Sequence, residues 1–419
     1  MVDANRTFVI VGGGLAGAKA AETLREEGFT GRVILIGDER DHPYERPPLS
    51  KGYLTGKEER DGVFVHETAW YARADVELHL GQVVTSIDRA GRSVHLGDNT
   101  VVHYDKLLLA TGAEPRRLDI PGTDLVGVHH LRRLAHADRL RHVLSALGRD
   151  NGHLVIAGGG WIGLEVAAAA RGYGAEVTVV EPAATPLHHV IGPELGQIFT
   201  DLHTAHGVRF HFGARLTEIT GQDGLVLAAR TDTGEEHPAH DVLAAIGASP
   251  RTALAEAAGL DMAAPEHGGG VAVDTSLRTS DPHIFAAGDI ASVEHPLFGT
   301  RLRVEHWANA LNGGPAAARA MLGQDVVYDR VPYFFSDQYD LGLEYSGWAP
   351  PGSYDQVVIR GDAGKREFIA FWLKDRRVLA GMNVNVWDVT DSIQRLIRGG
   401  RETDPEALGD PSVPLESLI

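Results

Sequence analysis

The chain has 419 residues, of which 43% are hydrophobic and 23% charged, and it carries a formal net charge of −18. This composition is typical of a globular protein with two or three domains, and the negative charge disfavours nucleic acid and anionic membranes as partners. Because the chain has no cysteine, the composition excludes a disulfide framework, a thiolate metal site, an iron–sulfur cluster on this chain and a redox-active dithiol.

The chain begins with the short polar segment Met1–Arg6, which has no signal-peptide pattern and leads directly into the first predicted strand. No later run approaches the roughly 18 apolar residues that cross a bilayer. We therefore expect a cytoplasmic protein without a membrane span, either a monomer or a homodimer. We also expect no metal site.

The first predicted elements are a strand, a glycine-rich turn and a helix. The apolar run Phe8–Val11 leads into Gly12-Gly13-Gly14-Leu15-Ala16-Gly17, and a stretch with helical spacing follows to about Arg25. This is a dinucleotide-binding fingerprint, in which the first glycine makes the turn, the second lets the backbone approach a pyrophosphate and the third lets the helix pack on the strand. The pyrophosphate lies at the positive N-terminal end of the helix.

An acidic residue about 20 positions beyond such a motif binds the adenosine ribose of the nucleotide. The next predicted strand, Arg32–Ile36, is followed by Gly37, Asp38 and Glu39. Since glycine occupies the usual position of the acid, we predict that Asp38 binds the ribose and rank Glu39 second.

Two shorter segments come next in the chain. Tyr44-Glu45-Arg46-Pro47-Pro48-Leu49-Ser50-Lys51 contains two adjacent prolines, which stiffen the backbone. Leu107-Leu108-Leu109-Ala110-Thr111-Gly112 is an apolar strand that runs into a turn of small residues.

A second fingerprint, Gly158-Gly159-Gly160-Trp161-Ile162-Gly163, follows the apolar run Leu154–Ala157. A helix to about Tyr173 and a strand that ends at Glu181 are predicted after it, and this carboxylate accepts hydrogen bonds from both hydroxyls of an adenosine ribose. A 2′-phosphate beside Glu181 is repelled, and no Lys or Arg occurs from Pro182 through Val208 to compensate. The second site therefore favours NADH over NADPH, and two fingerprints in one chain predict an enzyme that binds two nucleotides.

Further along, Asp281-Pro282-His283-Ile284-Phe285-Ala286-Ala287-Gly288-Asp289 is a buried-type strand that ends in Gly-Asp. Together with the Ala110–Gly112 turn and both fingerprints, it resembles the FAD-containing pyridine-nucleotide oxidoreductases over nearly the whole chain and in the same motif order. The resemblance implies FAD at the first fingerprint and places Asp289 on the ribityl chain of FAD.

Three segments are closely similar to the branch of that family that reduces small iron–sulfur proteins in bacterial oxygenase systems, the putidaredoxin-reductase-like and biphenyl-dioxygenase-reductase-like group. They are Tyr44–Lys51, Val304-Glu305-His306-Trp307-Ala308-Asn309-Ala310 and Pro332-Tyr333-Phe334-Phe335-Ser336-Asp337-Gln338-Tyr339. The resemblance implies that Lys51 pairs with Glu165 near flavin N5 and that Trp307 lies by the isoalloxazine. The chain departs from the group at Asn312-Gly313-Gly314-Pro315, to which we assign no role.

The chemistry favours few acid–base residues, since hydride transfer to a flavin needs no proton abstraction from carbon. We therefore interpret His306 as a packing residue rather than a general base, and the predicted catalytic residues are Lys51 and Glu165. The predicted FAD-site residues are Gly12, Gly14, Leu15, Ala16, Gly17, Asp38, Glu39, Arg46, Lys51, Val84, Ala110, Thr111, Gly112, Arg132, Gly288, Asp289, Glu305, His306 and Trp307. The predicted NAD-site residues are Gly158, Gly160, Trp161, Ile162, Gly163, Glu165, Glu181, Ile246 and Gly247.

The predicted fold class is α/β, with two doubly wound, Rossmann-like nucleotide-binding domains and a C-terminal α+β domain with an antiparallel sheet. The resemblance implies a glutathione-reductase-like architecture. We predict an FAD domain over residues 1–114 and 247–324, an NAD domain over 115–246 and the C-terminal domain over 325–419. In the last domain, alternation in Gln356–Arg360 and Phe368–Leu373 predicts antiparallel strands, and Asp388–Arg398 predicts an amphipathic helix with Val389, Ile393, Leu396 and Ile397 inward.

The resemblance implies an FAD-dependent NADH:ferredoxin reductase that supplies a cytochrome P450 or another oxygenase. The alternatives are a rubredoxin reductase or other NADH-dependent electron-transfer flavoprotein and, ranked lower, a redox binding protein similar to apoptosis-inducing factor, for which a basic surface is expected. A flavin monooxygenase ranks last because the His/Trp signature between its nucleotide motifs has no counterpart here.

Ferredoxins are usually acidic, so an acidic reductase needs a local basic surface to bind one. The candidates lie in the C-terminal domain, and the alternative is that they are scattered solvated charges. These candidates are Arg376, Arg377, Arg395, Arg398 and Arg401.

Overall fold

The computed structural model describes residues 5–419, so the part of the signal-peptide prediction that concerns Met1–Ala4 lies outside the described residues. The chain forms two compact units. Unit 1 consists of the residues up to Glu45, Arg60–Glu114 and Ser249–Tyr333, and unit 2 of Arg46–Glu59, Pro115–Ala248 and Phe334–Ile419. The limits of the three predicted domains stay a prediction. Over residues 5–419, no helix is long and apolar enough to cross a membrane.

Unit 1 is built on a five-stranded parallel sheet with the order β19-β7-β1-β2-β3. Phe8, Val9 and Ile10 of the central strand have no exposed surface, as expected for a parallel strand covered on both faces. The order of the strands reverses between β1 and β7, which is where doubly wound sheets bind ligands. The strands are β1 (Thr7–Val11), β2 (Arg32–Gly37), β3 (Val76–Leu80), β7 (Lys106–Leu109) and β19 (Ile284–Ala286).

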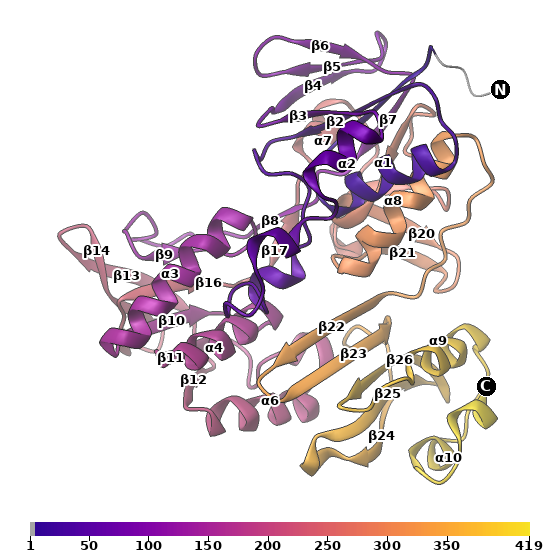
Figure 1. The fold of residues 1–419 in the computed structure, drawn as a ribbon. Helices are drawn as coiled ribbons and strands as arrows, with labels where there is room; N and C mark the ends of the chain where they lie inside the picture. Colours follow the sequence, from indigo (N-terminus) through magenta and orange to yellow (C-terminus); the bar gives the residue numbers. More distant parts are fainter. Residues whose placement is uncertain (1–4) are drawn as a thin grey trace. The chain divides into compact units, whose positions relative to one another are not determined.

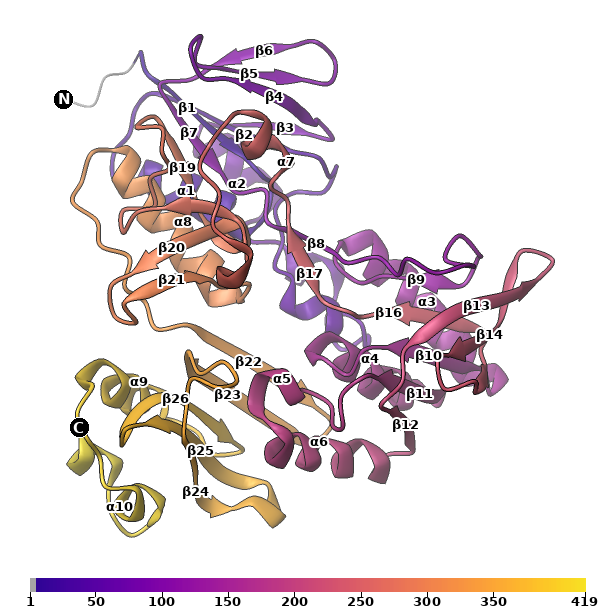
Figure 2. The ribbon, with the colours of Figure 1, turned by 180° about the vertical axis from the view of Figure 1, so that it is seen from behind.

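Helices α1 and α8 of unit 1 lie side by side (Figure 1). Two small sheets complete the unit, and Figure 2 shows one of them with its β20–β21 hairpin. The small sheets contain β4 (Val84–Asp88), β5 (Ser93–Leu96) and β6 (Val101–His103), and β18 (Val271–Val273), β20 (Ala291–His295) and β21 (Thr300–Arg303). The helices are α1 (Leu15–Glu26), α2 (Thr68–Arg73), α7 (Ala253–Ala257) and α8 (Trp307–Met321).

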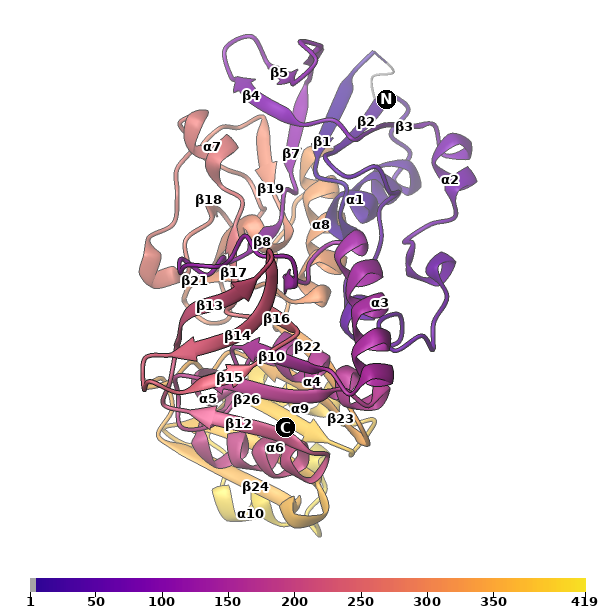
Figure 3. The same cartoon turned by 90° about the vertical axis from the view of Figure 1, so that its left-hand side faces the viewer.

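Unit 2 repeats the doubly wound arrangement in a parallel sheet with the order β12-β11-β10-β16-β9. A three-stranded antiparallel sheet accompanies it, and its β13–β14 hairpin is seen in Figure 3. The strands are β9 (Val128–His129), β10 (His153–Ala157), β11 (Glu176–Glu181), β12 (Val208–Phe212), β13 (Leu216–Gln222), β14 (Leu225–Thr231), β15 (Glu236–Pro238) and β16 (Asp241–Ala244). The helices are α3 (Leu134–Asp150), α4 (Trp161–Tyr173), α5 (His188–Ile191) and α6 (Pro193–Ala205). Strands β8 (Ala113–Pro115) and β17 (Ala248–Pro250) lie where the chain passes from one unit to the other.

The predicted antiparallel sheet of the C-terminal region is present, with the order β22-β23-β26-β25-β24. Its core is continuous with that of α6 within unit 2, since Phe199 and Trp372 belong to one buried cluster. The fold class predicted from the sequence is therefore confirmed. The elements are β22 (Tyr333–Gln338), β23 (Leu341–Gly347), β24 (Gln356–Asp362), β25 (Glu367–Lys374), β26 (Arg377–Val384), α9 (Thr390–Gly399) and α10 (Pro405–Gly409).

The predicted amphipathic helix is α9, and it buries Ile393, Leu396 and Ile397 as expected. Its start was predicted two residues too early. Asp388 has a left-handed φ of 62°, a conformation that an α-helix cannot contain. Val389 precedes the first helical residue and is only partly buried.

Candidate functional site

The first glycine turn joins β1 to α1 in unit 1. Gly12 has a φ of 131°, and a Cβ atom there would lie 2.0 Å from the carbonyl oxygen of Ala110. A Cβ at Gly17 would lie 2.2 Å from the carbonyl oxygen of Gly12, so both positions require glycine for packing alone. A Cβ at Gly14 meets nothing within 4 Å. Since the fold does not need a glycine at Gly14, this position is open for the close approach of a phosphate to the start of α1.

A cavity of about 500 Å³ opens at the carboxyl ends of β1 and β2 in unit 1, which is a usual size for a cofactor site. Asp38 lines this cavity, and its Oδ2 lies 3.1 Å from a guanidinium nitrogen of Arg251. Glu39 does not line it and instead accepts a hydrogen bond of 2.7 Å from the Tyr44 hydroxyl. The cavity therefore has Asp38, and not Glu39, among the residues that line it. The predicted FAD residues that line it are Gly12, Asp38, Val84 and Thr111.

The Gly288-Asp289 pair lies at the start of α1, beside the first turn. Gly288 has a φ of 77°, and a Cβ there would lie 3.3 Å from the Ala16 side chain. Asp289 is 8% exposed, and its backbone carbonyl accepts a hydrogen bond of 3.1 Å from Arg303, which also pairs with Glu305 at 2.6 Å. The structure thus joins two segments that are far apart in the sequence at the N-terminus of one helix.

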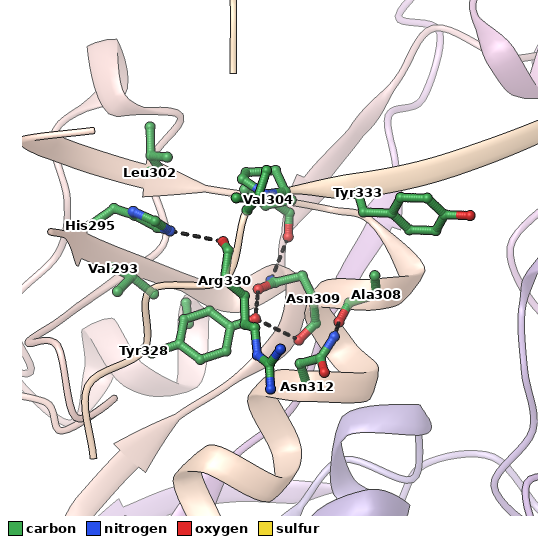
Figure 4. Close-up of a pocket in the computed structure, with 13 residues that line it drawn as sticks. Val293, His295, Leu302, Val304, Ala308, Asn309, Asn312, Tyr328, Arg330 and Tyr333 are labelled. Atoms are coloured by element: carbon green, nitrogen blue, oxygen red, sulfur yellow. Dashed lines mark hydrogen bonds between the residues drawn. The ribbon is translucent and has the colours of Figure 1, made fainter. Parts of the chain in front are cut away.

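Trp307 is the first residue of α8, and its indole nitrogen donates a hydrogen bond of 3.0 Å to Glu45. The same turn of the helix is held by Asn309, which donates to the Val304 carbonyl at 2.8 Å and accepts from the Tyr328 hydroxyl at 2.8 Å (Figure 4). The cavity that these side chains line measures about 20 Å³, enough for about one water molecule. This cavity is too small for an organic ligand, and the side chains around it stabilise the start of α8.

His306 precedes α8 and has a strongly lowered basicity. Burial lowers the pKa of its imidazole to about 4, although Asp289 acts in the opposite direction. A base with this pKa is weak at neutral pH, which supports the interpretation of His306 as a packing residue.

The Asn312–Pro315 segment has a packing role that the sequence did not reveal. A Cβ at Gly314 would lie 2.3 Å from the backbone oxygen of Ala16, so this glycine allows α8 to contact α1 closely. A glycine pair inside a helical pattern is the signal that indicates such a contact.

The second glycine turn, in unit 2, has the same geometry as the first. Gly158 has a φ of 103°, and its Cβ would lie 2.5 Å from the Ala245 carbonyl oxygen, whereas a Cβ at Gly160 meets nothing within 4 Å. Glu181 ends β11 with both carboxylate oxygens bound by backbone N–H groups, from Gly159 at 2.7 Å and Ala183 at 2.8 Å. The other predicted NAD residues lie on the same turn, on the start of α4 and just after β16, and among them Ile162 and Ile246 are exposed.

The predicted pair of Lys51 and Glu165 is present in unit 2. Glu165 lies on α4, is 4% exposed and accepts a hydrogen bond of 2.8 Å from the Lys51 ammonium group. Its carboxylate also accepts hydrogen bonds from the hydroxyls of Ser336, at 2.6 Å, and of Ser50. Three donors compensate the burial of this charge.

Ser50 and Ser336 were not predicted as site residues. Both occur in the quoted motifs, but nothing in a sequence indicates which hydroxyl reaches a distant carboxylate. Gln338 donates a 3.1 Å hydrogen bond to the Ser336 hydroxyl and contacts the buried His203 at 2.8 Å, so the network extends from α4 to α6. Burial also raises the pKa of Asp337, against the effect of Lys51.

Two further predicted FAD residues, Arg46 and Arg132, meet in unit 2, where the Arg46 guanidinium donates a hydrogen bond to the Arg132 carbonyl.

Three of the five candidate arginines of the C-terminal region have acceptors on their own chain. Arg376 lies 3.7 Å from Asp404, Arg395 lies 3.1 Å from Asp391, and Arg401 donates to an oxygen of Ile419 at 3.3 Å. These contacts reduce the positive charge that they offer to a partner, and the basic docking surface stays a prediction.

Comparisons with known proteins agree over the full length. The family model described as pyridine nucleotide-disulphide oxidoreductase matches residues 6–314, and the model described as reductase C-terminal matches residues 333–419. The ferredoxin–NAD(+) reductase component of the anthranilate 1,2-dioxygenase system from Burkholderia cepacia is 38% identical, over 98% of this chain and 99% of its own. Putidaredoxin reductase CamA from Pseudomonas putida is 36% identical, over 100% of this chain and 98% of its own.

Two solved structures share the fold at similar identity. The covalent complex of putidaredoxin reductase with putidaredoxin matches with a TM-score of 0.92 and 34% identity, covering 100% of this chain and 99% of the other. The ferredoxin reductase for the CYP199A2 system from Rhodopseudomonas palustris matches with a TM-score of 0.93 and 37% identity, covering 99% and 100%.

Proposed function

Because the chain belongs to the pyridine nucleotide-disulphide oxidoreductase family, we propose that it is an FAD-dependent NADH:ferredoxin reductase. It passes electrons from NADH to a small iron–sulfur protein, which supplies a cytochrome P450 or another oxygenase. The observation that carries this proposal is the buried Lys51–Glu165 pair in a chain without cysteine. Because the chain has no thiol or disulfide that could accept electrons from the flavin, the acceptor must be a separate molecule. Its relatives include reductase components of oxygenase systems and putidaredoxin reductase.

The cofactors are FAD at the first glycine turn and NADH at the second. When bound, FAD accepts a hydride from NADH and returns the electrons one at a time to a one-electron acceptor. We assign the pyrophosphate of FAD to the start of α1 at Gly14, its adenosine to the cavity at Asp38, and its ribityl chain to Asp289. The open position at Gly14 and the size of the cavity support these assignments. The remaining predicted FAD residues keep the roles proposed from the resemblance.

NADH binds with its ribose at Glu181 and its pyrophosphate at the start of α4. The carboxylate of Glu181 is held in place by the N–H groups of Gly159 and Ala183, so its orientation is set before the nucleotide arrives. A fixed carboxylate at this point accepts hydrogen bonds from ribose hydroxyls and repels a 2′-phosphate, which supports NADH over NADPH. NADH is a cytoplasmic reductant, and we place the reaction in the cytoplasm.

Lys51 and Glu165 position the reacting rings and adjust their charge. Lys51 keeps the role near flavin N5 that the resemblance implies, and within unit 2 Glu165 holds its ammonium group in one orientation through the 2.8 Å contact. Ser50 and Ser336 in turn hold Glu165, because each donates a hydroxyl hydrogen bond to its carboxylate. These two serines are positioning residues, and neither needs to exchange a proton.

The test is steady-state reduction of cytochrome c by the purified protein, with and without a [2Fe–2S] ferredoxin, after its visible spectrum is recorded. We expect a flavin spectrum, a preference for NADH over NADPH and strong stimulation by ferredoxin. Rubredoxin is included as an acceptor because rubredoxin–NAD(+) reductase from Pseudomonas putida is 35% identical over 90% of this chain. Faster turnover with rubredoxin favours that function instead, and a protein without flavin contradicts both.

The docking surface has its own test. If the arginines of the C-terminal region bind ferredoxin, Arg395→Glu with Arg398→Glu raises the KM for ferredoxin and leaves NADH-to-dye turnover unchanged. Unchanged ferredoxin kinetics would remove this surface from the proposal.

A further inference from the structure

Two histidines and a glutamate gather in unit 2, outside the Lys51–Glu165 network. His211 lies on β12, while Glu235 comes just before β15 and His237 lies within β15, in the neighbouring three-stranded sheet. One potential ligand atom from each residue lies within 4.8 Å of the other two. Imidazole nitrogens and carboxylate oxygens are the usual protein ligands of zinc and related ions.

His211 has a polar neighbour at each ring nitrogen. Its Nε2 lies 3.1 Å from the Thr233 hydroxyl, and its Nδ1 lies 3.1 Å from Oε2 of Glu235. If Nε2–H donates to Thr233, the Nδ1 lone pair faces a carboxylate, and two acceptors at this distance repel unless a proton or a cation lies between them. A second hydrogen bond that fixes the tautomer is a regular feature of histidine ligands.

His237 supplies a second nitrogen that faces the same carboxylate. Its Nε2 is buried, has no hydrogen-bond partner among residues 5–419, and lies 4.0 Å from Oε2 of Glu235, beyond hydrogen-bond length. A buried nitrogen without a partner is uncommon in folded proteins.

We propose that His211, Glu235 and His237 bind one divalent transition-metal ion, for which Zn²⁺ is the best match. Ligand atoms on a tetrahedral zinc with bonds of about 2.0–2.2 Å lie about 3.4 Å apart. The 3.1 Å separation lies slightly below this value and the 4.0 Å separation above it. The side chain of Glu235 is 59% exposed and is free to rotate between the two nitrogens. The same exposure lets the ion enter and leaves room for a water ligand.

The charges around the cluster do not oppose a cation. Arg209, which acts electrostatically on His237, pairs with Glu176 at 3.2 Å. Arg230, on β14, pairs with Glu236 at 2.7 Å and with Glu218 at 2.9 Å. Both positive charges are compensated by carboxylates outside the cluster, so Glu235 keeps its negative charge for the metal.

A bound ion would join β12 of the parallel sheet to the end of the three-stranded sheet. Because binding to the folded state alone stabilises it, Zn²⁺ should raise the melting temperature of the protein. The sequence predicted no metal site, since the two histidines and the glutamate become neighbours only when two sheets meet.

The test is calorimetric titration of zinc chloride into the full-length, flavin-containing protein without a histidine tag. We expect one equivalent to bind and to raise the melting temperature, with MgCl₂ producing neither effect because Mg²⁺ prefers oxygen ligands. The double variant His211→Gln and His237→Gln should bind Zn²⁺ at least about tenfold more weakly. His142→Gln, at an exposed histidine of α3, is the matched control.

Glu235→Gln is a second variant, at an exposed position that the fold tolerates, and it should weaken Zn²⁺ binding without changing flavin content. Flavin absorbance and NADH-to-dye turnover report whether each variant is folded. The proposal would be overturned if the folded double variant, His211→Gln with His237→Gln, bound Zn²⁺ as tightly as the His142→Gln control. It would also be overturned if the unaltered chain bound no Zn²⁺.

Discussion

The two glycine turns have nearly the same backbone but differ in the acidic residue beside them. Gly12 donates its N–H to Ile36 at 2.8 Å, and Gly158 donates to Val180 at 2.9 Å, the last partner before each strand end. The next residue is Gly37 in the first repeat and Glu181 in the second. The backbone of such a turn is therefore set by glycine, while the side chain at or just beyond the end of the neighbouring strand, Glu181 or Asp38, differs between the two repeats.

A second difference lies on the helices that follow the turns. Lys19 is two residues after Gly17 and pairs with Glu22 on its own helix, whereas Glu165 is two residues after Gly163 and is buried with donors from two other segments. The same position in the repeat thus carries a partly exposed ion pair within one helix in unit 1 and the charged centre of the network in unit 2. The comparison indicates which substitutions should have large effects and which should not.

The largest effect is expected for Lys51→Met. This change leaves the Glu165 carboxylate, which is 4% exposed, without its cation, and breaking a buried pair costs about 3–5 kcal/mol. Thermal unfolding should show a clear decrease in melting temperature. Adding Glu165→Gln should restore part of the loss, and an unchanged melting temperature in the single variant would show that the serines alone satisfy the carboxylate.

Glu181→Gln should have the next largest effect, and it should weaken the binding of NADH without affecting FAD. Loss of a charged acceptor costs about 1.5–3 kcal/mol, which corresponds to an increase in the KM for NADH of about 10- to 100-fold. Flavin content should not change. Asp38→Asn is the counterpart, and it should lower flavin content while leaving the KM for NADH unaltered; a change in both quantities for either variant would contradict separate sites.

We expect Gly14→Ala and Gly160→Ala each to weaken the binding of one nucleotide by about tenfold, or 1.4 kcal/mol. A Cβ at either position meets nothing within 4 Å, so the fold tolerates it and any loss arises from the ligand. Gly14→Ala should reduce flavin affinity, and Gly160→Ala should raise the KM for NADH with full flavin content. Equal effects of both substitutions on flavin content would contradict the conclusion that the two glycine turns bind different nucleotides.

The smallest effect is expected for Lys19→Met. Its partner Glu22 lies three residues away on the same helix, with side chains 24% and 18% exposed, and a helix pair at this spacing contributes about 0.2–0.5 kcal/mol. Melting temperature and turnover should both stay near those of the unaltered chain. A loss as large as that of Lys51→Met would mean that the two helix positions are equivalent after all.

The sequence alone determined the features that depend on neighbouring residues. The turns at Gly12 and Gly158 and the strand over Phe368–Leu373 follow from local backbone sterics and residue type, and their places were predicted correctly. The predicted alternation was wrong, because β25 buries all six residues from Phe368 to Leu373. The start of α9 was placed wrongly, because the left-handed conformation of Asp388 has no marker as clear as a glycine.

The tertiary structure decided the features that join distant segments. Ser50 and Ser336 reach Glu165 from 115 and 171 positions away, and the cavity favours Asp38 over Glu39 because of the residues around it. The cluster of His211, Glu235 and His237 arises in the same way, where two sheets meet. Such contacts depend on how the elements pack, which residue type and spacing do not encode, so only the folded chain could reveal them.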